Sequence, residues 1–202
     1  MEPGQLVVDV GAGTGALTLA AATAGARVLA VERDPDWART LGRRAREAGV
    51  ADRVRVVRGD LREVSWPEGR WRMIANPPFG LTTALLRRLL DDPERGPDAA
   101  DLVLQWEVAR KFAAQPPATL LGASWAPWWE MTLVERIPRS AFRPVPTVDA
   151  GWLRVRRRRP DVLAPRLAGA WEAFLRDAWP ATTAPSATAA RPAEGRAPRR
   201  RP

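Results

Sequence analysis

The chain has 202 residues, 46% of them hydrophobic and 27% charged, which is enough for one globular domain with a buried core. It contains neither Cys nor His, which excludes disulfides, zinc-thiolate sites, thiol nucleophiles and catalytic imidazoles. No apolar run reaches the roughly 18 to 20 residues that span a bilayer, and no secretory signal opens the chain, so we expect a cytoplasmic protein without membrane contact.

The net charge of +9 comes almost entirely from arginine. A basic surface suits phosphate backbones, and guanidinium groups add stacking and bidentate contacts that lysine lacks. A GC-rich genome would also enrich Arg together with Ala, Gly and Pro, so composition leaves both explanations open. The last twelve residues hold five Arg and one Glu, or +4, which leaves +5 for the rest of the chain.

Apolar strands and helical patterns alternate through the first half of the chain. We predict strands at 6–10, 27–31, 53–57, 72–75 and 102–106, and helices at 15–24, 35–48, 81–90 and 107–114. This alternation is typical of a parallel, doubly wound sheet.

The rhythm changes after Pro116 and Pro117. Two predicted strands, 131–137 and 151–155, follow each other without a helix between them, which indicates an antiparallel pair at the sheet edge. One more helix is predicted at 166–178. From residue 180 the chain is Ala, Thr, Pro and Arg without periodicity, which is typical of a disordered tail.

The predicted fold class is therefore α/β. We expect a Rossmann-like, doubly wound, mostly parallel seven-stranded sheet with an antiparallel edge pair and a very short C-terminal helical appendage. The sheet domain would cover 1–158, the helical appendage 159–179 and the tail 180–202.

Three further groups of residues can be interpreted from their type and position. Aromatic clusters near a sheet edge more often pack in the core than offer stacking surface, so we interpret Trp125, Trp128 and Trp129 as core. The run Arg154–Arg159 is either a phosphate contact or a solvated strand end. Glu107 and Arg110 are interpreted as the solvated face of a helix.

A glycine-rich loop follows the first predicted strand. Residues 9–15 read Asp-Val-Gly-Ala-Gly-Thr-Gly and lead into a helix, where a dinucleotide-binding fold places its cofactor loop. Glycine permits the tight turn and lets a ligand approach the backbone. Glu32 ends the second strand, where an acid can accept hydrogen bonds from ribose hydroxyls. The alternative is a purely structural turn, but together these features predict a cofactor site that includes Asp9, Gly11, Gly13 and Glu32.

The acids around this loop indicate which cofactor it binds. Pyrophosphate loops usually read G-x-G-x-x-G, whereas this one reads G-x-G-x-G after an acid, and Asp60 with Leu61 follows the third strand. Acids suit a cationic sulfonium with an amino acid tail and an adenosine better than a dinucleotide phosphate. We therefore predict S-adenosylmethionine, with Glu32 on its ribose and Asp60 on its adenine amino group. A solvated loop acid is the alternative for Asp60.

The segment Asn76-Pro-Pro-Phe79 follows the fourth predicted strand, at the same edge as the glycine loop. An exocyclic aromatic amine is a poor nucleophile because its lone pair is delocalised into the ring. The Asn76 side-chain oxygen and a backbone carbonyl can accept the amine hydrogens, and the prolines hold these acceptors rigidly. Phe79 offers a face on which an extruded base can stack. The segment predicts amine methylation without metal or histidine, and a proline-rich turn is the alternative.

With these residues in view, the chain resembles the ribosomal RNA adenine N6-methyltransferases, especially the erythromycin-resistance methylases of 23S rRNA. The resemblance covers roughly residues 5 to 158. Its most specific part is the segment 138–149, which contains the pattern F-x-P-x-P-x-V-D from Phe142 to Asp149. The other matching segments are Asp9–Thr18, Val31–Asp34, Gly59–Asp60, Asn76–Gly80 and Gln105–Arg110.

The resemblance implies a class I methyltransferase that methylates the N6 amine of an adenine in 23S rRNA. It implies that Gly11, Gly13 and Glu32 hold the methionine and ribose parts of the cofactor and Asp60 its adenine. Asn76 and the Pro77 carbonyl would orient the target amine. The modification would block macrolide, lincosamide and streptogramin B binding, and we expect the protein to act as a monomer.

The sequence departs from the family pattern in three places. Family members carry a Gln-Asn-Phe-type segment that covers the cofactor before the first strand, whereas here the first predicted strand begins at Leu6. The family motif more often reads Asn-Ile-Pro or Asn-Leu-Pro where this chain has Pro77. The C-terminal helical domain is abbreviated to about one helix, which leaves RNA contact to Arg patches and the tail.

Two other classes of function therefore stay open. One is a small-subunit rRNA adenine dimethyltransferase, or another Asn-Pro-Pro amino methyltransferase that acts on DNA or protein. The other is a catalytically impaired, RNA-binding relative. The intact Asn76–Phe79 segment argues against the impaired relative, and the short appendage with its Arg-rich tail favours a 23S methylase over the small-subunit enzyme.

Overall fold

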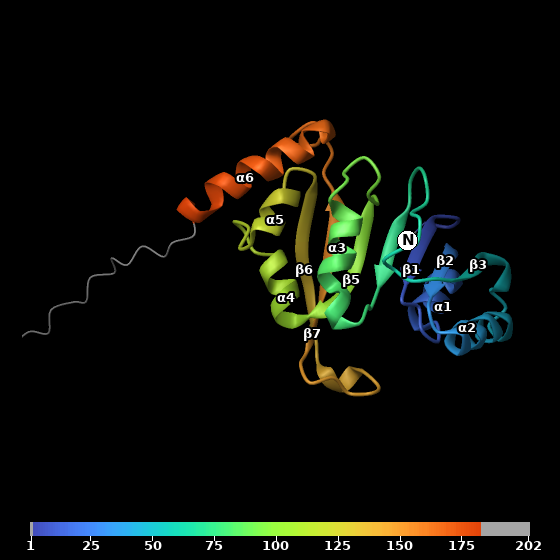
Figure 1. The fold of residues 1–202 in the computed structure, drawn as a ribbon. Helices are drawn as coiled ribbons and strands as arrows, with labels where there is room; N and C mark the ends of the chain where they lie inside the picture. Colours follow the sequence, from blue (N-terminus) through green and yellow to red (C-terminus); the bar gives the residue numbers. More distant parts are fainter. Residues whose placement is uncertain (1, 183–202) are drawn as a thin grey trace, which may run out of the picture.

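The computed structural model describes residues 2–182, which form a seven-stranded sheet with helices against it (Figure 1). The strands are β1 (Leu6–Val10), β2 (Arg27–Glu32), β3 (Val54–Arg58), β4 (Arg72–Ala75), β5 (Ala99–Gln105), β6 (Trp129–Ile137) and β7 (Ala150–Arg157). The helices are α1 (Ala16–Thr23), α2 (Pro35–Glu47), α3 (Thr82–Leu90), α4 (Trp106–Phe112), α5 (Leu120–Trp125) and α6 (Ala168–Thr182). Short 3₁₀ turns lie at Ala51–Arg53, Phe79–Leu81, Arg139–Ala141 and Pro165–Leu167. None of the described helices is long and apolar enough to cross a membrane.

The strand order confirms the predicted fold class. The order is β3-β2-β1-β4-β5-β7-β6, with β1 to β5 parallel and β7 antiparallel to both β5 and β6. Because β7 runs against both of its neighbours, β6 points the same way as β5. The carboxyl ends of β1 to β6 therefore meet at one edge of the sheet, which we call the carboxyl edge. Ligands of open α/β sheets bind at this edge.

Two apolar clusters hold the helices against the two faces of the sheet. Val7 belongs to the cluster that contains Leu41 of α2, whereas Val8 belongs to the cluster that contains Leu85 of α3. Successive residues of a strand point to opposite faces, so the two clusters lie on opposite sides of the sheet. This arrangement fixes the loops at the carboxyl edge between two packed layers.

The tryptophan cluster belongs to the core, as predicted. Trp125, Trp128 and Trp129 are at most 2% exposed, and each indole N–H is satisfied, by Asp91, Leu163 O and Leu90 O respectively. A buried indole needs such an acceptor, because an unsatisfied N–H would cost free energy.

The arginine run after the middle of β7 is bound mainly within the protein. Arg154 donates to Asp101, Arg157 to Asp161, Arg158 to Ala126 O and Arg159 to Asp98. Since β7 ends at the edge opposite the carboxyl edge, these contacts favour a structural role over a phosphate contact near the predicted site. Glu107 and Arg110 form the expected exposed pair on α4, at 2.7 Å.

Several boundaries differ from the prediction. Strand β5 begins at Ala99 rather than at residue 102, and Trp106 begins α4 instead of ending the strand. The Trp106 N–H, which has no acceptor within the helix, donates to Asp149 O. Helix α5 was not predicted. Helix α6 spans 168–182 instead of 166–178, so residues 180–182 of the predicted tail are helical, and 183–202 lie outside the described residues.

Candidate active site

The glycine loop joins β1 to α1 at the carboxyl edge. Gly11 has a φ of +70°, and a Cβ built there would meet no atom within 4 Å, so its backbone faces open space. Gly15 has a φ of +93°, and a Cβ there would lie 2.1 Å from Leu41 Cδ1. Glycine at these two positions therefore allows a left-handed turn and close packing of the loop on α2. The loop is built so that a ligand can touch its backbone.

Asp9 supports this loop from its buried position at the end of β1. Its side chain is 1% exposed and accepts a 2.5 Å hydrogen bond from the Thr18 hydroxyl of α1. Burial raises the pKa of Asp9 to about 6, which the Thr18 hydrogen bonds partly oppose. The structure thus places Asp9 between β1 and α1, outside the cavity that the neighbouring residues line.

Glu32 fixes the loop from the side. Its carboxylate accepts from the Gly13 N–H at 2.7 Å and from the Asp34 N–H at 2.8 Å. Asp34 in turn caps α2, by accepting from the N–H groups of Asp36 and Trp37. Each carboxylate oxygen has a second lone pair, so Glu32 can hold the loop and still accept from a ligand.

Asp60 is held as a charged acceptor after β3. Its carboxylate accepts two hydrogen bonds from the Arg62 guanidinium, at 2.9 and 2.7 Å, and Arg33 lies 3.8 Å away. The hydrogen bonds from Arg62 and the two positive charges hold the pKa of Asp60 well below its ordinary value. Asp60 is therefore ionised at any physiological pH, with lone pairs left for a hydrogen-bond donor such as an aromatic amine.

The segment Asn76-Pro-Pro-Phe79 leaves the end of β4 beside β1. Asn76 is exposed, and its side chain makes no hydrogen bond to the part of the chain that the structure describes. Pro77 is buried, and the Pro78 carbonyl accepts from the Leu81 N–H at 2.9 Å, which closes the turn that carries Phe79. The backbone is thus fixed while the Asn76 amide remains available to a ligand.

These pieces line one cavity of about 820 Å³. Seven of the nine predicted site residues line it, namely Gly11, Glu32, Asp60, Leu61, Asn76, Pro77 and Phe79. The connection between β6 and β7 closes one side, with Phe142, Arg143, Pro144 and Pro146 of the F-x-P-x-P pattern. Asp9 and Gly13 do not line it: Asp9 is buried, and the Gly13 N–H is directed to Glu32.

Trp37 and Arg33 also line the cavity, and neither was predicted as a site residue. Trp37, in the first turn of α2, is 54% exposed, and Arg33 lies in the loop before that helix. No sequence pattern distinguished Trp37, because it stands four residues before the buried Leu41, on the helix face expected to pack in the core. Its ring lies against the glycine loop, 3.7 Å from the position of a Cβ on Gly13, and also lines the cavity.

The cavity fits S-adenosylmethionine on three counts. The Gly11 backbone borders open space, Glu32 and Asp60 line the cavity with carboxylate acceptors, and the volume lies within the range of small-molecule sites. Among residues 2–182, no group of three or more acidic side chains could hold a metal ion. The Asn76 amide, exposed at this cavity, can donate hydrogen bonds to a ligand and accept them from it.

Comparison with known proteins agrees with this geometry. MyrB, a mycinamicin-resistance protein of Micromonospora griseorubida, is 40% identical over 173 residues, which are 86% of this chain and 53% of MyrB. A probable ribosomal RNA small subunit methyltransferase A of Haloarcula marismortui is 37% identical over 162 residues, 79% of this chain and 55% of that protein. The chain thus spans about half the length of these curated relatives. The crystal structure of the 23S rRNA methyltransferase ErmE has a TM-score of 0.79 at 28% identity, and the match covers 91% of this chain and 73% of ErmE.

The sequence-based resemblance is confirmed by the family comparison. The model of the ribosomal RNA adenine dimethylases matches residues 1–179. The chain therefore belongs to the ribosomal RNA adenine dimethylase family, whose members are S-adenosylmethionine-dependent methyltransferases.

Proposed function

We propose that this chain methylates the exocyclic N6 amine of an adenine in 23S rRNA, with S-adenosylmethionine as the methyl donor. The observation that carries the proposal is the exposed Asn76 amide, which has no partner among the described residues, at the mouth of a cavity lined by Glu32 and Asp60. The same modification would give resistance to macrolides, lincosamides and streptogramin B. We propose a monomeric enzyme that acts in the cytoplasm.

Each residue that would bind the cofactor is given one role. Gly11 would let the methionine part approach the backbone, Glu32 would accept from the ribose hydroxyls, and Asp60 with Leu61 would receive the adenine. When bound, S-adenosylmethionine supplies an electrophilic methyl group on a sulfonium. Asp9 would act indirectly, through the loop that it supports.

At the target end, the chain must make a weak amine nucleophilic. The Asn76 oxygen and the Pro77 carbonyl would accept the two amine hydrogens, which draws the nitrogen toward tetrahedral geometry and frees its lone pair. The fixed Pro77-Pro78 backbone holds these acceptors in place without reorganisation. Phe79, half-buried at the cavity, would stack on the extruded base.

The choice of the large-subunit RNA rests on similarity and on the pattern from Phe142 to Asp149. MyrB is named for mycinamicin resistance, and ErmE for 23S rRNA methylation. The Haloarcula relative is named for the small subunit, at similar identity, and this observation makes a small-subunit adenine dimethyltransferase the second candidate.

The test is methyl transfer from radiolabelled S-adenosylmethionine to protein-free 23S rRNA, with the methylated nucleotide mapped afterwards. We expect Asn76→Ala to lower the rate by roughly 100-fold or more, because one preorganised acceptor is removed. Asn76→Asp keeps an acceptor oxygen at the same position and should retain part of the rate. Cofactor affinity of both variants is the control that the fold is intact.

Any other result of this methylation assay would indicate a different function. Label only in 16S rRNA would select the small-subunit candidate. Label only in DNA or protein would indicate a different amino methyltransferase. RNA binding without any incorporation by the wild-type chain would contradict the enzymatic proposal.

A further inference from the structure

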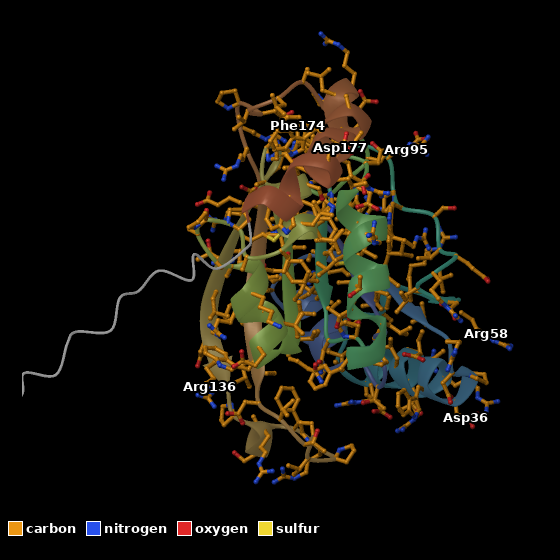
Figure 2. All side chains as sticks on the ribbon, turned by 60° about the vertical axis from the view of Figure 1, so that its left-hand side comes forward. Asp36, Arg58, Arg95, Arg136, Phe174 and Asp177 are labelled. Carbon is orange, nitrogen blue, oxygen red and sulfur yellow. The ribbon has the colours of Figure 1, made fainter. Side chains whose placement is uncertain are left out.

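A second hollow lies at the carboxyl edge, next to the active-site cavity. It has a volume of about 470 Å³ and is lined by residues from the end of β5, the start of α4 and the β6–β7 connection. Figure 2 shows Arg136, one of its lining residues, at the same end of the molecule as Asp36 of α2, opposite Phe174 and Asp177 of α6. The hollow therefore opens at the end of the molecule where the target adenine would enter.

The two hollows share one wall. Phe142, Arg143, Pro144 and Pro146 of the β6–β7 connection line the active-site cavity, and the next three residues, Thr147, Val148 and Asp149, line the second hollow. On the other side, Gln105 ends β5 and Trp106 begins α4, and β5 is the direct neighbour of β4, which Asn76 follows. An RNA strand that places one nucleotide against Asn76 would thus reach the second hollow with a neighbouring nucleotide.

The interior of the second hollow has surfaces that suit a nucleobase. The Arg136 guanidinium carbon lies 5.0 Å from the centre of the Trp106 ring, and Asp149 holds that guanidinium at 2.9 and 2.7 Å. Val148 adds apolar surface and is 43% exposed. Arginine planes and indoles both stack on bases, and this stacking tolerates any base because every base has a π face.

The charge of the hollow suits a phosphate. Arg139 is exposed, and its guanidinium forms no ion pair within the part of the chain that the structure describes. The hydrogen bond from the Arg139 backbone N–H and those from the Arg136 side chain lower the pKa of Asp149, so this acid stays ionised and offsets Arg136. Glu107 is paired with Arg110 on α4. The charge of Arg139 also acts on Asp149, so the guanidinium groups of Arg110, Arg136 and Arg139 face two carboxylates and leave one net positive charge for an anion.

We propose that this hollow binds the nucleotide next to the target adenine, with its base against the Trp106–Arg136 pair and its phosphate on Arg139. The inference rests on the proposed function, because it assumes an RNA strand whose adenine occupies the active-site cavity. The second hollow would be an additional binding site that holds the RNA strand while the target base is extruded.

The test couples a change in the protein to a change in the RNA. The substrates are a hairpin that contains the mapped adenine and two versions with an abasic site, one on its 5′ side and one on its 3′ side. With the wild-type chain, one abasic hairpin should raise KM about tenfold, which is the effect expected for removing one stacked base. With Trp106→Leu the intact hairpin should already show that KM, and the abasic site should add nothing.

Three controls keep the result specific. Trp106→Phe keeps an aromatic face and should restore the tenfold sensitivity. Arg139→Ala should weaken hairpin binding, whereas Arg95→Ala, which removes the same charge at the α6 end of the molecule, should leave it unchanged (Figure 2). Affinity for S-adenosylhomocysteine should be unchanged in all four variants, which shows that they are folded.

The outcomes for the subsite and for the enzyme are separable. If the wild-type chain methylates the hairpin but neither abasic version changes KM, or if Trp106→Leu leaves the abasic effect in place, the subsite is refuted and the proposed function stands. If the wild-type chain methylates no RNA, the proposed function fails, and with it the subsite.

Discussion

At the scale of single residues, Asp9 supports the glycine loop, but its buried carboxyl lowers the stability of the folded state when it ionises. Its carboxyl is buried beneath the loop, next to Glu32, and its pKa is raised to about 6. An unfolded chain ionises this group near pH 4, whereas the folded chain keeps the proton to about pH 6. The folded state therefore binds more protons between these values, and stability falls as pH rises through that range. Above pH 6 the ionised group costs about 3 kcal/mol.

This asymmetry predicts that Asp9→Asn stabilises the protein at neutral pH. The amide oxygen can still accept from Thr18, and no charge is buried. The difference in the free energy of unfolding between Asp9→Asn and wild type should grow by about 1 kcal/mol from pH 5 to pH 7.5. Urea denaturation at both pH values measures it, with Glu68→Gln, at an exposed position, as the control. A difference that is the same at both pH values would contradict the raised pKa of Asp9.

At the scale of elements, α3 and the loop after β3 are tied together by Arg88. Its guanidinium donates to Leu61 O at 2.8 Å and to Val64 O at 2.7 Å, and it lies 5.0 Å from the centre of the Trp66 ring. The Trp66 indole N–H returns a hydrogen bond to Arg88 O at 2.9 Å. The helix that follows the Asn76–Phe79 segment thus positions the loop that carries Asp60.

Arg88 is therefore predicted to be a positioning residue for the cofactor. Arg88→Ala should raise the dissociation constant for S-adenosylhomocysteine about tenfold, because it removes two charged hydrogen bonds to the loop backbone. Arg87→Ala on the same helix removes an equal charge that only pairs with Asp91, at 3.6 Å, and should leave affinity unchanged. Titration calorimetry well below the melting temperature separates affinity from stability. Equal affinities in both variants would refute the positioning role.

The sequence was most informative where periodicity and turn chemistry agree. The glycine loop, Glu32, Asp60 and Asn76 were all placed at strand ends, and the parallel order of β1 to β4 brings them to one edge. Helix α5 was missed because its small residues, from Gly122 to Ser124, carry no apolar stripe, although the Thr119 cap was a usable signal.

Long-range contacts explain what else was not predicted. The first residues of β5, Ala99 and Ala100, have little intrinsic preference for strands, and they are held there by pairing with β4 and β7. The end of β6 at Ile137 was predicted, but the return of Phe142 and Pro146 onto the active-site cavity depends on the path of the β6–β7 connection, which no local pattern encodes.

At the scale of the whole molecule, many arginines are paired with acids, and a large share of the net charge comes from the last twelve residues. Many arginines of the described part are bound to acids, including those paired with Asp60, Asp98, Asp101, Asp149 and Asp161. Charges neutralised in this way contribute little to phosphate binding. The five arginines after residue 190, with Glu194 between them, account for +4 of the +9. Much of the charge available to RNA therefore lies in the C-terminal sequence.

The last prediction follows from this distribution. Replacing Arg191, Arg196, Arg199, Arg200 and Arg201 by Gln lowers the net charge from +9 to +4 and leaves residues 2–182 unchanged. RNA affinity should fall, and the slope of log Kd against log salt should become shallower by roughly 0.7 for each RNA phosphate that the variant no longer neutralises. Affinity for S-adenosylhomocysteine should not change, because the residues that line the active-site cavity within 2–182 are all left as they are. The measurement is hairpin binding between roughly 50 and 200 mM salt, a range over which counterion release changes affinity strongly. An unaltered salt slope would mean that the phosphates are bound by the folded body, with Arg139 and its neighbours at the carboxyl edge as the first candidates.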